Sequence, residues 1–427
     1  MEQQTNKKGV IVAIISMMFL FAMISFVTNL AAPFGNIWGK TYSWAGMVGN
    51  LMNFLAYLFM GIPAGKMLVK YGYKKTALMA IAVGFGGLLI QYLSSIFGAD
   101  CDLFTVKGQP VMLNFIIYLL GAFICGFCVC MLNTVVNPML NLLGGGGNRG
   151  NQLIQTGGTL NSLAATLTPF FVGVLIGQVT DKTSMTDVTP LLWIAMGVFA
   201  VTFLIISFVA IPEPQSTASG VKAEHSPWSF RHFILGVIAI FFYVGIEVGI
   251  PGELNFYITK LGFPSAAAIA GAIVAFYWLL MLVGRFISSF ISGKISSRTQ
   301  LIFTSTLAIV LLLIAIVLPE KSVVSFQNSQ VPTKCFFVIA CGICTSVMWG
   351  GIFNLATEGL GKYTAAASGI FMMMVVGGGV MPFIQDVLAT SLLGYIGSYW
   401  LVIAMLVYLL YYGLVGCKNI NKDIPIE

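Results

Sequence analysis

Two carboxylates lie inside one long apolar stretch of the sequence. The residues FFYVGIEVGIPGELNF, 241–256, place Glu247 and Glu253 on either side of Pro251. A carboxylate within a membrane-spanning segment is costly and by default marks a functional site. On a regular helix the two glutamates are about 240° apart and do not share a face. We predict that Glu247, with Tyr243 on its face, binds substrate or a proton in a central cavity, and that Glu253 belongs to an outer gate. The alternative is that Glu247 only holds its helix against a neighbour.

A proline spacing repeats this arrangement near the N-terminus. Asn29 precedes Pro33 by four residues, as Glu247 precedes Pro251. Because proline has no N–H, the carbonyl oxygen four residues earlier loses its helical hydrogen bond. Each segment therefore combines a polar side chain with a free carbonyl, which is costly in hydrocarbon unless both face a wet cavity or a ligand. We expect the two prolines to let their helices bend during gating.

Amide and aromatic side chains are scattered through the other apolar segments. Amides donate and accept hydrogen bonds together, and aromatic faces suit the C–H face of a sugar ring, so the set favours a neutral, hydrogen-bonding ligand. Alternatively, Asn and Gln join helices, at about 0.6 kcal/mol each, and we expect this of part of the set. With Tyr243 and Glu247, the predicted binding residues are Asn29, Asn133, Asn137, Gln155, Asn161, Tyr277, Trp278, Trp349 and Asn354.

The composition is that of a polytopic membrane protein. Of 427 residues, 58% are hydrophobic and only 8% are charged, whereas a soluble domain of this size needs far more surface charge. The net charge of +7 comes from short basic clusters between apolar segments, so we expect no nucleic-acid partner. Both histidines lie in or beside a polar linker, and the eight cysteines lie mostly in apolar runs, where packing is favoured over metal binding. We predict no metal, cofactor or catalytic residue, since HExxH and GxSxG motifs are absent.

Polar breaks divide the chain into twelve apolar runs, each long enough to cross about 30 Å of hydrocarbon. The runs are 9–36, 43–68, 75–98, 110–142, 150–177, 188–211, 231–258, 264–291, 299–318, 334–357, 364–390 and 393–416. We therefore predict an all-α membrane protein with an N-terminal six-helix bundle over 1–211, a linker over 212–230 and a C-terminal six-helix bundle with a short tail over 231–427. Because the tail after 416 has only about eleven residues, we do not expect a receptor with a signalling domain.

Charge and internal similarity support a duplicated transporter. With both termini in the cytoplasm, most of the 21 Lys and Arg residues fall on the inner side, as the positive-inside rule requires. Gly65-Lys66, which ends the second run, recurs 219 residues later as Gly284-Arg285 at the inner end of the eighth. Duplicated bundles are the arrangement with which transporters build a site at the interface of the two halves.

Several motifs resemble known sequences. The turn GKMLVKYGYKK, 65–75, resembles the loop Gly-x-x-x-Asp-Arg-x-Gly-Arg-Lys of the major facilitator superfamily, although Val69 stands where that loop has Asp. Other stretches are similar to the fucose–galactose–glucose symporter family. These are NTVVNP at 133–138, TLNS at 159–162, YVGIEVGI at 243–250, VGRF at 283–286 and GLGKYT at 359–364.

The resemblance implies a fold and an activity. The fold is twelve helices in two pseudo-symmetric bundles, and the activity is import of a hexose or deoxyhexose by alternating access, usually with a proton. It implies that Asn161 lines the sugar site and that Glu247 binds sugar and carries the proton. Fucose permeases have carboxylates where this chain has Asn29 and Asn133, which cannot titrate. An uncoupled facilitator or a sodium-driven symporter is therefore the first alternative, and a multidrug exporter the second.

The gates and the setting of the protein complete these expectations. We expect a monomer in a bacterial inner membrane, with a sugar and the lipid bilayer as its partners. The predicted gating residues are Pro33, Pro251, Glu253, Arg285 and Glu358.

Overall fold

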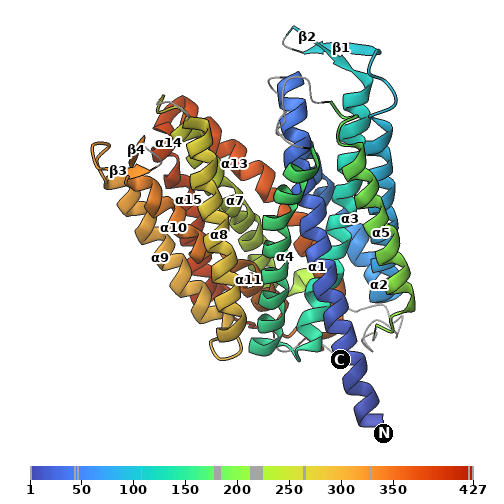
Figure 1. The fold of residues 1–427 in the computed structure, drawn as a ribbon. Coiled ribbons are helices and arrows are strands. Elements are labelled where there is room, and N and C mark those ends of the chain that lie inside the picture. Colours follow the sequence, from blue (N-terminus) through green and yellow to red (C-terminus); the bar gives the residue numbers. More distant parts are fainter. Residues whose placement is uncertain are drawn as a thin grey trace. The chain divides into compact units, whose positions relative to one another are not determined.

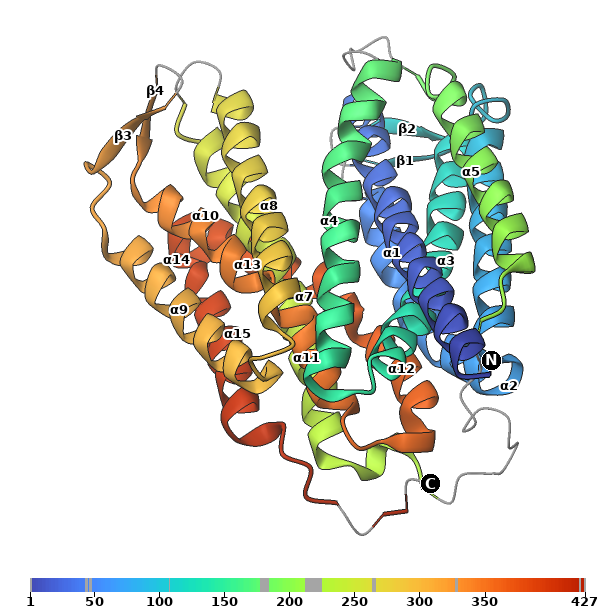
Figure 2. The ribbon, with the colours of Figure 1, turned by 60° about the horizontal axis from the view of Figure 1, so that its bottom comes forward.

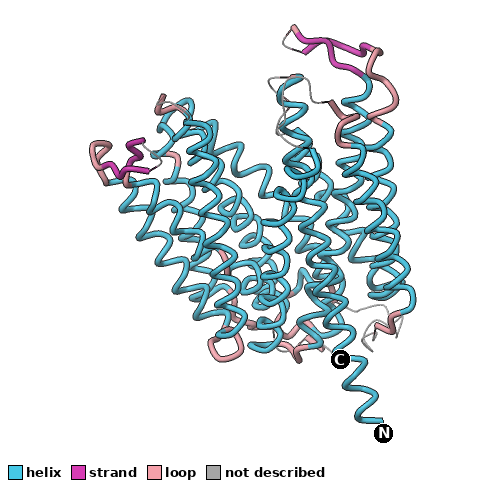
Figure 3. The backbone as a smooth tube through the Cα atoms, viewed as in Figure 1, coloured by secondary structure: helices cyan, strands magenta, loops and turns pink. Residues whose placement is uncertain are grey.

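The described chain is almost entirely helical. The computed structural model describes residues 2–42, 45, 48–106, 108–176, 184–211, 225–262, 266–326, 329–421 and 424–425, without the side chains of 2–8, 30–33, 35–36, 39–40, 50, 169–176 and 266–268. Figure 3 shows helices over nearly all of this length and strands in two short hairpins. A helix satisfies its backbone hydrogen bonds within one segment, as a bilayer requires. The all-α prediction is confirmed.

The predicted apolar runs fall on these helices. Ten helical segments of the described residues are long and apolar enough to cross a membrane. One of them, Leu51–Leu93, contains most of the predicted runs 43–68 and 75–98, and helix α4, Gly147–Ile176, overlaps the predicted run 150–177. Helix α4 is not among the ten, and the part of it whose side chains are described, 147–168, is rich in Asn, Gln, Thr and Gly. The twelve-helix prediction therefore agrees with the helices present.

The chain forms two compact units. Unit 1 comprises Met1–Met139, Leu163–Lys222 and Ser368–Met373, and unit 2 comprises Leu140–Ser162, Ala223–Ala367 and Met374–Glu427. The predicted bundle boundaries at 211 and 231 stay predictions, and residues 212–224 of the predicted linker lie outside the described residues.

Unit 1 is built around a long bent helix. Its helices are α1 (Glu2–Thr41), α2 (Val48–Leu93), α5 (Thr189–Phe208), most of α3 (Leu113–Leu143) and the second half of α4. Helix α2 changes direction at Gly72, whose φ of 81° lies in the left-handed region that favours glycine. The bend separates the first arm of α2 from the second arm, which packs beside α5 (Figure 1).

Small residues bring the second arm of α2 close to α3. A Cβ atom added to Gly87 would lie 2.7 Å from the Cys125 sulfur, and one added to Gly84 would lie 2.6 Å from that of Cys128. Both cysteines are fully or almost fully buried. They fill the space that the glycines leave open, so their observed role is packing.

Unit 2 is arranged around α7, Arg231–Thr259. This helix contacts α8, α10, α11, α13 and α15, and Figure 2 shows α8, α9 and α10 as neighbouring helices of the same unit. The other helices of the unit are α8 (Ala266–Ile291), α9 (Ser297–Val317), α10 (Lys334–Thr345), α11 (Met348–Thr357), α13 (Gly377–Leu388), α14 (Gly394–Gly397) and α15 (Tyr399–Tyr411). Helix α12 (Thr364–Met373) begins in unit 2 and ends in unit 1.

Shorter turns connect these helices. They are the 3₁₀ turns η1 (Pro227–Ser229), η2 (Gly361–Tyr363) and η3 (Met374–Val376) and the π-helical turns η4 (Ala389–Leu393) and η5 (Tyr412–Gly416).

Two of the predicted runs are interrupted helices. The run 334–357 divides into α10 and α11 at a turn formed by Ser346 and Val347, and the run 364–390 divides into α12 and α13 at η3. Interrupted helices leave backbone carbonyls without helical donors, and in transporters such breaks lie beside the binding site.

Two hairpins were not predicted. Strands β1 (Asp102–Val106) and β2 (Gln109–Met112) pair antiparallel before α3, and β3 (Val323–Phe326) and β4 (Ser329–Pro332) pair antiparallel before α10. Each strand has only four or five residues, and β1 and β3 are mostly exposed, so the sequence there lacks the hydrophobic alternation that indicates a strand.

Candidate functional site

Glu247 lies in the middle of α7, four residues before Pro251. The helix continues to Thr259, so the proline sits in its interior. Because Pro251 has no N–H, the Glu247 carbonyl needs another donor. The hydroxyl of Tyr277 on α8 donates to this oxygen at 3.3 Å. The carbonyl that was predicted to be free therefore accepts a hydrogen bond from a side chain of the neighbouring helix α8.

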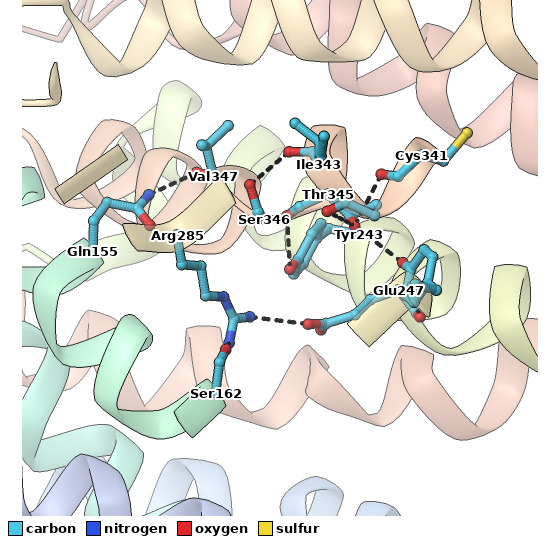
Figure 4. A network of polar contacts seen from close by, with 12 residues as sticks. Gln155, Ser162, Tyr243, Glu247, Arg285, Cys341, Ile343, Thr345, Ser346 and Val347 are labelled. Carbon is cyan, nitrogen blue, oxygen red and sulfur yellow. Dashed lines mark hydrogen bonds and ion pairs between the residues drawn. The ribbon is translucent and has the colours of Figure 1, made fainter. Parts of the chain in front are cut away.

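The Glu247 side chain forms an ion pair with Arg285 of α8. Nη2 of Arg285 lies 3.1 Å from Oε1 of Glu247, and the two side chains are only 11% and 15% exposed. Nη1 of the same guanidinium donates to the Ser162 hydroxyl on α4 at 2.7 Å. Figure 4 shows Arg285 between these two partners. The single guanidinium thus joins α4, α7 and α8 within unit 2.

Two tyrosine hydroxyls contact the end of α10. Tyr243 donates to the Thr345 carbonyl at 3.2 Å (Figure 4). The Tyr277 hydroxyl lies 3.0 Å from the Thr345 hydroxyl. Both tyrosines are fully buried. Because α10 ends at Thr345, its carbonyl is open to a side-chain donor. We call Ser162, Tyr243, Glu247, Tyr277, Arg285 and Thr345 the Glu247 network.

Predicted aromatic residues surround this network. The half-buried Trp349 has its ring centroid 6.3 Å from that of Tyr243. Trp278 stacks edge-on against Tyr277 at 5.2 Å and is 42% exposed. Of the predicted binding residues, the structure therefore brings together Tyr243, Glu247, Tyr277, Trp278 and Trp349.

Amides of α4 and α11 join helices of unit 2. The buried Gln155 donates to the Val347 carbonyl at 2.9 Å, at the break between α10 and α11. Asn354 is buried as well and donates to the hydroxyl of Ser297 at 2.9 Å. Asn161 is half-buried on α4, next to Ser162 in the chain. Gln155 and Asn354 therefore make hydrogen bonds between helices, which is the role that the sequence analysis gave as the alternative to binding the ligand.

The remaining predicted amides belong to unit 1. Asn133 donates to the Tyr57 hydroxyl at 2.9 Å, and Asn137 donates to the Asn133 carbonyl at 2.9 Å. Half-buried Asn29 donates to the Ser25 carbonyl one turn earlier at 2.8 Å. Tyr57 was missed by the sequence analysis because a tyrosine in an apolar run gives no signal of its own.

The predicted gating residues lie in different surroundings. Glu253 is only 2% exposed, and within the described part of the chain its Oε2 has no hydrogen-bond partner. Glu358 is exposed and follows α11 directly. Pro251 lies in α7, whereas the side chain of Pro33 falls outside the described residues. Arg285 lies six residues before the end of α8, which ends at Ile291, as the predicted run does.

His232 lies beside the linker, as expected. It is the second residue of α7 and fully buried. Its Nε2 lies 2.9 Å from the Glu358 carbonyl. The histidine therefore joins the beginning of α7 to the end of α11.

Comparisons with known proteins agree with this fold. The chain is 29% identical to a protein of Brucella abortus named glucose/galactose transporter, over 98% of this chain and 97% of the relative. It is 27% identical to a putative glucose/galactose transporter of Helicobacter pylori, over 98% and 99% of the two chains.

A solved structure and a family match complete the comparison. The crystal structure of the E. coli fucose:proton symporter superposes with a TM-score of 0.78, covering 95% of this chain and 98% of the other at 19% identity. The sequence model of the Major Facilitator Superfamily matches residues 10–382 of this chain. The chain therefore belongs to the Major Facilitator Superfamily.

Proposed function

We propose that the protein imports a sugar of the hexose or deoxyhexose class by alternating access, coupled to a cation through Glu247. The protein is a membrane transporter and not an enzyme. Support for a sugar comes from relatives named glucose/galactose transporter and from the fold of a fucose:proton symporter. The observation that carries the proposal is the Glu247 network.

The chemistry of the network suits a sugar. Each sugar hydroxyl donates and accepts hydrogen bonds, and Glu247, Arg285 and the tyrosine hydroxyls supply acceptors and donors within one region. The ring of Trp349 beside Tyr243 offers an apolar face for the C–H groups of the sugar. Such a mixture of a few polar groups with aromatic rings is typical of small-molecule sites.

The ion pair supplies a means of coupling. In the structure Oε1 of Glu247 is paired with Arg285, so a proton taken up by the carboxylate removes the negative charge that holds this pair. Arg285 also holds Ser162 of α4, which links the state of the carboxylate to the position of another helix. We propose that a proton taken up by Glu247 releases Arg285 and loosens this link. Because Asn29 and Asn133 cannot titrate, neither of them carries the proton in this proposal.

We further propose how the protein sits in the cell. It is embedded in a lipid bilayer, which we take to be the bacterial inner membrane, with both termini in the cytoplasm and as a monomer. The distribution of Lys and Arg supports the orientation. The protein needs no bound metal or organic cofactor under this proposal, and nucleic acid is not a partner.

Uptake by proteoliposomes tests the proposal. Purified protein would be assayed with radiolabelled glucose, galactose and fucose under imposed pH and sodium gradients, applied separately. We expect Glu247→Gln to abolish concentrative uptake while sugar counterflow survives, because exchange needs binding but no coupled ion. Glu320→Gln, which removes a carboxylate outside the network, is the matched control and should accumulate sugar normally.

Each result decides between the alternatives. Accumulation driven by sodium alone would assign the coupling ion as sodium, and equilibration without accumulation would make the protein a facilitator. Full accumulation by the Glu247→Gln variant would refute its coupling role. If no sugar is transported or raises the unfolding temperature, the sugar assignment fails and an exporter becomes the better reading.

A further inference from the structure

An apolar groove lies in unit 1 between α5 and the second arm of α2. It has a volume of about 410 Å³, within the range of about 300–1,000 Å³ that ligand pockets occupy. Its lining contains no polar side chain. The residues are Ile81, Ala82, Phe85, Phe199, Ala200, Phe203 and Leu204. The occupant of such a groove must present an apolar chain to it.

Positive charge gathers at one end of this groove. The ammonium of Lys74, on the second arm of α2, donates to the Ser207 carbonyl at 2.8 Å. Ser207 follows Leu204 of the groove by three residues on α5, which is less than one helical turn. The contact between α2 and α5 therefore closes the end of the groove with a lysine.

A second lysine lies on the same face of α2 as the groove. Lys75 is exposed and lies seven residues before Ala82, so the two share a face of α2 and are separated by about 10 Å along the axis. A lysine stem lies along apolar surface while its ammonium reaches polar surroundings. Lys66 and Lys70 belong to the same basic turn, and the sequences of α2 and α5 contain no carboxylate. The charges that α2 and α5 bring to this end are therefore all positive.

We propose that this groove binds an anionic phospholipid, with one acyl chain between α2 and α5 and the headgroup phosphate at Lys75 and Lys74. The lining fits an acyl chain and no polar ligand. The spacing of about 10 Å between Lys75 and Ala82 is compatible with a phosphate at the lysine and the first part of an acyl chain in the groove.

The test compares two lipids with identical acyl chains. Full-length protein in detergent would be titrated with phosphatidylglycerol or phosphatidylcholine, and bound lipid counted by native mass spectrometry together with the unfolding temperature. We expect phosphatidylglycerol to be retained preferentially and to raise the unfolding temperature more. Lys75→Gln should weaken its retention about fivefold, the effect of one lysine near an anionic lipid, and leave phosphatidylcholine unchanged.

Groove filling tests the acyl-chain part independently. Ala200→Phe should reduce retention of phosphatidylglycerol, whereas Val201→Phe places the same side chain on α5 outside the lining and should not. Lys321→Gln, an exposed lysine between α9 and β3, is the control for charge, and Lys75→Arg should retain lipid if the fold is intact. Equal retention of the two lipids, or equal loss in the control variants, would overturn the proposal. If inorganic phosphate displaced phosphatidylglycerol completely, the groove would not be holding an acyl chain, and this part of the proposal would be wrong.

Discussion

The hydroxyl of Tyr277 occupies the place of the backbone donor that Pro251 removes from α7. It donates to the Glu247 carbonyl at 3.3 Å and also lies 3.0 Å from the Thr345 hydroxyl. The proline thus changes an internal bond of α7 into a bond between α7, α8 and α10. A helix tied in this way can bend at residue 251 only if Tyr277 follows or releases the carbonyl.

This relationship predicts a coupling between two substitutions. Tyr277→Phe should lower stability by about 1–2 kcal/mol, because it leaves the buried Glu247 carbonyl without a donor. In a Pro251→Ala background the new N–H restores the helical bond, so the cost of Tyr277→Phe should be smaller. Thermal unfolding of the four proteins measures the difference. Equal costs in both backgrounds would show that the two residues act independently.

The Glu247–Arg285 pair predicts a larger non-additive effect. Arg285→Met leaves a buried carboxylate unpaired and should cost about 3 kcal/mol, since removing one partner of a buried pair is strongly destabilising. Glu247→Gln in addition should recover much of that loss. Unfolding temperatures of the single and double variants measure the interaction. Simple addition of the two costs would mean that the pair contributes little to folding.

The loop between α9 and β3 predicts a dependence on pH. Burial works against ionisation of Glu320, but hydrogen bonds from Lys334, at 2.7 Å, and Tyr257 outweigh it, so its pKa lies below the usual range. The folded pKa is lower than the unfolded one, so the pair stabilises the protein above the unfolded value of about 4.3 and the contribution is lost as pH falls through the folded value. The Glu320 side chain is 61% exposed, so we expect less than about 1 kcal/mol.

Unfolding at two pH values checks this effect. Glu320→Gln should lower the unfolding temperature at pH 7, and its difference from the wild type should shrink below about pH 4. Asp102→Asn, an exposed carboxylate on β1, is the control and should show a smaller difference at either pH. A difference that persists unchanged at low pH would assign the effect to packing and not to ionisation.

Local sequence patterns predicted the helices and the importance of Glu247. Hydropathy over a run of twenty residues depends only on the residues of that run, and a carboxylate or a proline inside it is visible at once. The position of Pro251 predicts that the Glu247 carbonyl lacks its helical donor and needs another one. The donor was not, because Tyr277 is thirty residues away and belongs to another helix.

The pairing of Arg285 shows why the rest could not be predicted. Its contact with Glu247 depends on how far α8 slides along its neighbours, and that register is set by close approaches elsewhere. A Cβ atom on Gly342 would lie 2.5 Å from the Tyr277 carbonyl, and one on Gly284 would lie 2.2 Å from the Ser346 hydroxyl. The break at Ser346 contains neither proline nor glycine and gives no local signal. Such contacts appear only once the helices are packed.

A close approach in unit 1 gives the last prediction. A Cβ atom on Gly61 of α2 would lie 2.6 Å from the backbone nitrogen of Met373 and 2.7 Å from the carbonyl oxygen of Gly369, both on α12. Backbone atoms cannot turn aside as a side chain does, so Gly61→Ala must push the two helices apart, at a cost of about 1–3 kcal/mol. Gly86→Ala is the matched control on the same helix, since nothing lies within 4 Å of its added methyl group, and alanine there should stabilise by up to about 1 kcal/mol. Thermal unfolding should therefore separate the two variants in opposite directions. If both shift the unfolding temperature alike, the contact between α2 and α12 does not contribute to stability.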